Sequence, residues 1–219
     1  MSSDDPTPVS PTVRAQLLAT EHWSLLAARG LTWSEVMSRI TLHLTVTSAA
    51  LVVLALVTQA SGFGTPFFVL AIGLTSAILI LGTLTGIRVH NANIDDSLMI
   101  AGMNRLRAAY LELDQGLAEY FVTSPYDDLA GVTQTYTMGA ARSVTSHVAG
   151  SAFTFINIVN AITAGTLGAL VIAAAGGSPR AMSVVGAVSG LLYLVSMADV
   201  SRRSFRQLAI PSRFPSPHG

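Results

Sequence analysis

The sequence predicts an all-α polytopic membrane protein with four transmembrane helices, whose second and third spans extend into a cytoplasmic antiparallel helical hairpin. Three observations predict this fold class. Of the 219 residues, 51% are hydrophobic and only 11% are charged, whereas a soluble domain carries about 25% charged residues. Four separate apolar stretches approach the length of about 20 helical residues that a bilayer core requires. The arginines, finally, collect on one side of those stretches.

The residues before the first span divide into two parts. Residues 1–10 are acidic and proline-rich, which predicts a disordered tail. Residues 11–30 place apolar side chains such as Leu17 and Trp23 among polar ones. This pattern predicts an amphipathic helix at the membrane surface or on the cytoplasmic bundle.

A helix boundary is predicted just before the first span. Gly30 can end the preceding helix, and Thr32 with Glu35 forms a capping-box pattern at the start of the next one. We therefore expect span 1 within residues 31–60 and, after a connector rich in turn residues, span 2 within residues 66–87.

Residues 88–150 predict the cytoplasmic hairpin. Its turn is expected at Ser124-Pro125, since the residue before a proline disfavours helix, and Asp127 or Asp128 can cap the second arm. An apolar heptad stripe runs along the first arm and consists of Met99, Met103, Leu106, Tyr110, Leu113, Leu117 and Tyr120. The stripe can pack inside the hairpin or against neighbouring subunits as a stalk.

Spans 3 and 4 are predicted within residues 151–176 and 181–199, and residues 200–219 form a basic, proline-rich tail. Small-residue positions in the spans allow close helix approach, either within one subunit or between subunits. The glycines concerned are Gly82, Gly86, Gly165, Gly186 and Gly190. The tail arginines that directly follow span 4, expected at lipid headgroups, are Arg202, Arg203 and Arg206.

Arginine placement predicts the orientation. Eleven of the twelve arginines lie before span 1, between spans 2 and 3, or after span 4, and only Arg180 lies in a short connector. The excess of positive charge on the cytoplasmic side of membrane proteins therefore predicts cytoplasmic termini in a plasma membrane protein. The short connectors leave no room for an extracellular domain.

Polar residues mark a candidate pathway or gate near the cytoplasmic end of the spans. A polar stripe in span 3 contains Asn157, Asn160 and Thr163, which suits either hydrogen bonding between helices or the lining of a pore. The exit of span 2 adds Arg88, His90, Asn91 and Asp95, and His43 is expected at a similar level. Mutual satisfaction of polar groups, an ion-selective ring and a metal site are the three interpretations of this belt.

The same sequence argues against several function classes. Cysteine is absent and no histidine pair has metal-ligand spacing, so we expect no enzyme, metal or cofactor. The formal net charge of zero gives no reason to expect nucleic acid. Two hypotheses remain ahead of an enzyme or transporter. The first is a homo-oligomeric ion channel or ion-conducting protein in the lipid bilayer; the second is a non-conducting adaptor whose hairpin tip binds a cytoplasmic protein.

Overall fold

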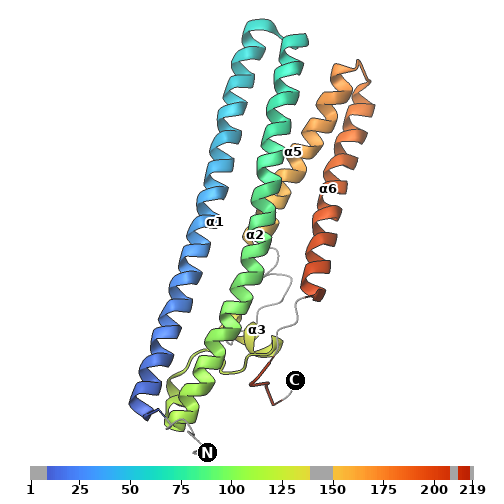
Figure 1. The fold of residues 1–219 in the computed structure, drawn as a ribbon. Coiled ribbons are helices and arrows are strands. Elements are labelled where there is room, and N and C mark those ends of the chain that lie inside the picture. Colours follow the sequence, from blue (N-terminus) through green and yellow to red (C-terminus); the bar gives the residue numbers. More distant parts are fainter. Residues whose placement is uncertain (1–8, 139–149, 208–211, 218–219) are drawn as a thin grey trace, which may run out of the picture. The chain divides into compact units, whose positions relative to one another are not determined.

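The computed structural model describes residues 9–138, 150–207 and 212–217, and every regular element within them is a helix (Figure 1). Four of these helices are long and apolar enough to cross a membrane. The elements are α1 (Pro11–Ser61), α2 (Thr65–Leu113), the 3-10 helix η1 (Gln115–Tyr120), α3 (Leu129–Thr137), α5 (Ala152–Ala174) and α6 (Pro179–Gln207). The predicted all-helical class with four candidate membrane spans is confirmed.

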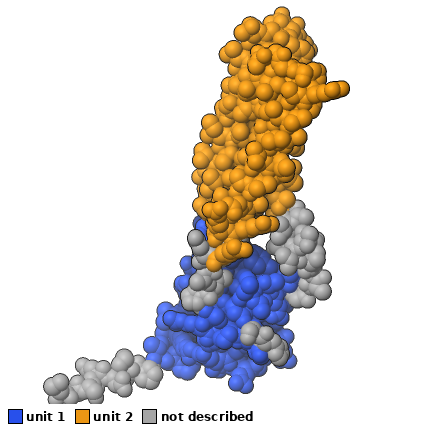
Figure 2. All heavy atoms as spheres, turned by 90° about the vertical axis from the view of Figure 1, so that its right-hand side faces the viewer, with its two compact units in different colours: residues 1–32, 94–142, 209–219 blue, residues 33–93, 143–208 orange. Residues whose placement is uncertain are grey.

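The chain divides into two compact units, which Figure 2 shows in different colours. Unit 1 comprises residues 1–32, 94–142 and 209–219, and unit 2 comprises residues 33–93 and 143–208. Helices α1 and α2 contribute residues to both units.

The predicted helix boundary before span 1 is wrong. Helix α1 runs without interruption for 51 residues, and Gly30 and Thr32 lie in its interior. A glycine inside a helix costs only about 1 kcal/mol, and no proline follows the first residue of α1. Packing on both sides offsets that cost, because Leu25 contacts the core of unit 1 and Val36 belongs to the core of unit 2.

The segment after span 2 follows the prediction only in its first part. Helix α2 continues past Arg88 for a total of 49 residues, but it ends at Leu113, before Leu117 and Tyr120 of the predicted stripe. There the Asp114 side chain accepts a hydrogen bond from the Gly116 backbone N–H at 2.8 Å and starts η1. A short polar side chain that caps the next element thus ends the long helix.

The second arm also differs from the predicted hairpin, in which span 3 extends into this arm as one helix. Asp128 caps its start, as expected, but α3 has only nine residues and ends at Met138, whose φ of 50° is left-handed. Residues 139–149 lie outside the described residues. Ser151 caps a new helix by accepting a hydrogen bond from the Thr154 N–H at 3.2 Å, so span 3 begins its own helix, α5.

Helices α5 and α6 lie side by side and approach each other closely (Figure 1). A Cβ atom on Gly165 would lie 2.9 Å from the carbonyl oxygen of Gly186, and one on Gly190 would lie 2.8 Å from that of Ala161. Side chains at these positions would push the backbones apart. The small residues of spans 3 and 4 are therefore used within one subunit.

The core of unit 1 combines apolar packing with a buried ion pair. Met103 of the predicted stripe is buried together with Ile100 and Val132. Asp96, only 1% exposed, accepts hydrogen bonds from Arg29 Nε at 2.5 Å and from the Tyr136 hydroxyl at 2.6 Å. This carboxylate joins α1, α2 and α3.

The remaining stripe residues are less buried than an internal seam requires. Leu106, Tyr110, Leu113 and Leu117 are half-buried. Tyr120, by contrast, is 71% exposed. The stripe contributes to packing through its first half, because the long helix ends at Leu113 and later residues no longer share its face.

Candidate functional site

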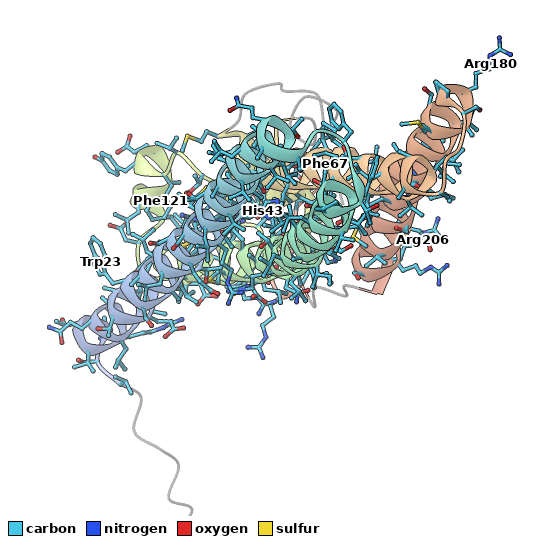
Figure 3. The ribbon with its side chains drawn as sticks, turned by 90° about the horizontal axis from the view of Figure 1, so that it is seen from above. Trp23, His43, Phe67, Phe121, Arg180 and Arg206 are labelled. Carbon is cyan, nitrogen blue, oxygen red and sulfur yellow. The ribbon has the colours of Figure 1, made fainter. Side chains whose placement is uncertain are left out.

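Polar side chains from three helices gather within unit 2, where His43 and Asn160 lie directly against a glycine of a fourth helix. His43 comes from α1, Asn157 and Asn160 come from α5, Tyr193 comes from α6, and Gly82 lies on α2. Figure 3 shows His43 among the helices. We call these five residues the polar cluster.

His43 is buried against the backbone of α2. Its side chain is 2% exposed, and neither ring nitrogen has a hydrogen-bond partner in the described part of the chain. The position that a methyl group on Gly82 would occupy is already taken by the His43 ring and the amide of Asn160. Glycine at this position is therefore what allows the imidazole and the amide to meet.

A directed chain of hydrogen bonds begins at Asn160, which is fully buried. Its Nδ2 donates to the Tyr193 hydroxyl at 3.0 Å, and that hydroxyl lies 3.2 Å from Thr83 Oγ1. Thr83 already donates its own proton to the carbonyl of Leu79 at 2.7 Å. Tyr193 is therefore the donor to Thr83, and the chain connects α5 through α6 to α2.

The two asparagines each keep one acceptor without a partner. Asn157 donates from Nδ2 to the carbonyl of Phe153 at 2.8 Å. Its Oδ1 and that of Asn160 have no hydrogen-bond partner among the described residues. Leaving a buried polar group unpaired costs about 1–3 kcal/mol. Several such groups in one place are typical of a site that holds water or an ion.

Arg88, a predicted pathway residue, forms an ion pair in unit 2. Its Nη2 donates to Glu35 Oε2 at 2.7 Å, and Arg39 Nε donates to Glu35 Oε1 at 2.8 Å. Glu35 thus binds two arginines, one on its own helix and one on α2. The sequence pattern assigned Glu35 to a capping box; in the structure it is a counter-ion.

The other predicted pathway residues are not all brought together. His90 is 5% exposed and packs against the Phe153 ring at a centroid distance of 5.6 Å. Thr163 is buried and donates to the carbonyl of Val159 at 2.9 Å. Asn91 and Asp95 are exposed on α2, and neither belongs to the polar cluster.

Sequence reasoning missed Tyr193 and Thr83. Both are uncharged and lie in apolar spans, so no charge or motif marks them. A tyrosine in the middle of a span was nevertheless a usable signal, because a buried tyrosine hydroxyl usually has a hydrogen-bond partner.

The predicted tail contains an ordered part. Helix α6 extends to Gln207 because no proline follows its first residue and no glycine follows Gly190. Arg202, Arg203 and Arg206 are exposed, and Arg203 pairs with Asp199 at 2.6 Å; Figure 3 shows Arg206 pointing away from α6. Residues 212–217, which we call the tail segment, are hydrogen-bonded to Asp127 and Asp128 within unit 1.

In the described ranges, no group of three or more histidine, aspartate or glutamate side chains is arranged to hold a metal ion. Comparisons with protein-family models, curated proteins and solved structures found no match to this chain.

Proposed function

We propose that this chain is a non-enzymatic plasma membrane protein that conducts ions or protons as an assembly of identical subunits. In this proposal both termini and residues 88–150 face the cytoplasm, as the arginine distribution favours. The observation that carries the proposal is the polar cluster, in which the His43 ring nitrogens and two asparagine oxygens are buried among the spans and have no hydrogen-bond partner in the part of the chain that the structure describes.

The chemistry of the cluster suits the transfer of protons or small ions. An imidazole can donate or accept a proton at either nitrogen, and amide oxygens bind water or cations. Asn157, Asn160 and Thr163 follow one another at intervals of three residues, which is about 4.5 Å along a helix axis. A single water molecule can bridge such steps. Polar groups inside spans are expensive and mark ion pathways by default.

The surface of the spans supports assembly of several copies. Within the most apolar window of each candidate span, the buried share is 17% in α1, 28% in α2, 22% in α5 and 0% in α6. Most of each span therefore remains available to lipid or to neighbouring subunits. Because four helices enclose little space, we infer that a conducting pathway needs several copies.

The test is flux through purified protein in liposomes. Proton flux is followed with an enclosed pH-sensitive dye, and cation flux is followed by swelling or current. His43→Leu should reduce flux at least tenfold while leaving thermal stability unchanged or higher, since the His43 side chain has no hydrogen bond to lose among the described residues. Thr45→Val is the matched control, because Thr45 is exposed on α1 and donates only to the carbonyl of Thr41. Absence of flux from the unaltered protein, together with a monomeric state in lipid, would overturn the proposal.

An adaptor protein is the second candidate, and one observation favours it. Five large apolar side chains among the described residues of unit 1 lie outside the predicted spans and are more than 70% exposed: Trp23, Tyr120, Val122, Leu129 and Met138. Leu129→Asp should then abolish binding of a cytoplasmic protein partner while the protein shows no flux. Ser124 is only 1% exposed, so deleting the Ser124-Pro125 turn would disrupt unit 1 and is the poorer test.

A further inference from the structure

The tail segment is bound by a buried carboxylate. Asp127 is fully buried, and its Oδ1 accepts hydrogen bonds from Ser212 Oγ at 2.7 Å and from the Phe214 N–H at 2.8 Å. Its Oδ2 accepts from the Arg213 N–H at 2.9 Å and from Arg105 Nε at 2.5 Å. Four donors, from Ser212, Arg213, Phe214 and Arg105, therefore surround this carboxylate.

Neighbouring groups extend the contact in both directions. The Asp127 backbone N–H donates to the carbonyl of Phe214 at 3.1 Å. Asp128 Oδ2 accepts from the N–H of Ser216 at 2.7 Å and from its hydroxyl at 2.6 Å. The two carboxylates thus accept hydrogen bonds from three backbone N–H groups and from the hydroxyls of two serines that are four residues apart.

Arg105 supplies the fixed positive charge behind this site. Arg105 lies on α2 and forms an ion pair with Asp127. Asp128 is a second charged side chain that interacts with Asp127. Although burial favours the neutral acid, the hydrogen bonds from Arg213, Arg105, Ser212 and Phe214 outweigh it and hold the pKa of Asp127 well below its ordinary value. The site is therefore anionic at neutral pH and accepts donors only.

Added negative charge on either serine would turn this attractive contact into a repulsive one. A phosphorylated serine carries a charge of about −1.5 to −2 and has no hydroxyl donor. At Ser212 or Ser216 that charge would meet a carboxylate now 2.6–2.7 Å from the serine oxygen. Ser212 is exposed and Ser216 half-buried, so both are accessible once the segment loosens.

We propose that Asp127 and Asp128 form a peptide-binding site whose ligand is the unmodified serine segment Ser212–Ser216, and that negative charge on Ser212 or Ser216 releases it. The site recognises hydroxyl and N–H donors and rejects phosphoserine. The proposal is independent of ion conduction, since it rests on unit 1 alone.

Trypsin cleavage between Arg213 and Phe214 measures release, because the N–H of that peptide bond is donated to Asp127. The full-length protein in lipid nanodiscs is digested, and intact mass reports the rate of this cut. We expect Ser212→Asp and Ser216→Asp to raise the rate more than tenfold. Ser212→Ala removes one hydrogen bond to the ionised Asp127 carboxylate without adding charge, and because Ser212 is exposed it should raise the rate by no more than about tenfold.

Two controls keep the test sharp. Ser10→Asp adds the same charge at an exposed serine whose capping of the Val13 N–H an aspartate can preserve, and it should leave the rate unchanged. Cleavage after Arg107, half-buried in α2, reports unfolding of unit 1 and should stay slow in every variant. Unchanged cleavage at Arg213 in both serine-to-aspartate variants would overturn the proposal. So would a parallel rise at Arg107, since the charge would then unfold unit 1 instead of releasing the segment.

Discussion

The buried carboxylate of Asp96 offers a direct test of how unit 1 is held together. We consider the substitution Asp96→Asn, which keeps the shape of the side chain and removes its charge. In the structure Asp96 accepts from Arg29 at 2.5 Å and from the Tyr136 hydroxyl at 2.6 Å. The amide would leave Arg29 without its counter-ion and would weaken the bond from Tyr136.

The expected loss follows from the exposure of the two partners. Removing one member of a fully buried ion pair costs about 3–5 kcal/mol. Here the Asp96 side chain is 1% exposed but that of Arg29 is 35% exposed, so water stabilises the remaining guanidinium and reduces the cost. A hydrogen bond to a charged group contributes about 1.5–3 kcal/mol. We therefore expect Asp96→Asn to destabilise unit 1 by about 2 kcal/mol.

Hydrogen–deuterium exchange in lipid nanodiscs measures this change locally. A loss of about 2 kcal/mol corresponds to roughly thirtyfold faster exchange of protected amides. The effect should appear in α3, which Tyr136 ties to Asp96. Glu119→Gln removes the same charge at an exposed position and should change stability by less than about 0.5 kcal/mol.

A double-mutant cycle with Tyr136→Phe separates the two contacts of Asp96. The two substitutions share one hydrogen bond, so their effects should fall short of additivity by about 1 kcal/mol. Burial, and then the bond to Asp96, raise the pKa of Tyr136. The stability that the protonated Tyr136 hydroxyl contributes is present below pH about 10, the ordinary pKa of tyrosine. It is lost as the pH rises through the raised pKa of Tyr136. If the α3 amides of Asp96→Asn exchanged at the wild-type rate, the reasoning would be refuted, because the buried carboxylate would then contribute nothing to the stability of unit 1.

Three further predictions address the other features. Gly30→Ala should stabilise the protein by about 0.5–1 kcal/mol, measured by thermal unfolding, because Gly30 lies within a continuous helix with open space around it; a loss of stability would indicate a break in α1. Gly190→Val should destabilise the protein by about 1–3 kcal/mol in the same assay, since its Cβ would meet the Ala161 carbonyl, and an unchanged melting temperature would contradict the close α5–α6 approach. The tail segment and Arg105 hold the pKa of Asp127 below its ordinary value. The stabilisation that ionised Asp127 provides is therefore present above pH about 4. Exchange protection of the tail-segment amides, corrected for intrinsic exchange rates, should stay constant from pH 7 to pH 4.

The spans could be predicted from the sequence because lipid imposes a simple rule on length and polarity. The helix boundaries outside the spans could not. The Gly30 and Thr32 pattern is a sound local signal, yet packing of Leu25 and Val36 on either side outweighed it. Conversely, the heptad stripe continues beyond Leu113, where a cap by Asp114 ends the helix. Local propensity is worth about 1 kcal/mol per residue, which tertiary contacts readily exceed.

The polar cluster could be predicted only in outline. Asn157 and Asn160 stood out because amides are costly in a span, and His43 because it is ionisable. Which residues meet depends on how α1, α2, α5 and α6 pack, and no periodicity carries that information. For the same reason Asp127, which pairs with residues 85–87 positions away in the sequence, resembled an ordinary helix cap.

That long sequence separation has a consequence during biosynthesis. Asp127 leaves the ribosome well before Ser212, and at about 5–20 residues per second the 85 residues between them take about 4–17 s to synthesise. Throughout that interval spans 3 and 4 are being made, and the loop carrying Asp127 lacks three of its donors. The loop is therefore completed only after the last span has been translated, so its closure follows the synthesis of all four candidate spans.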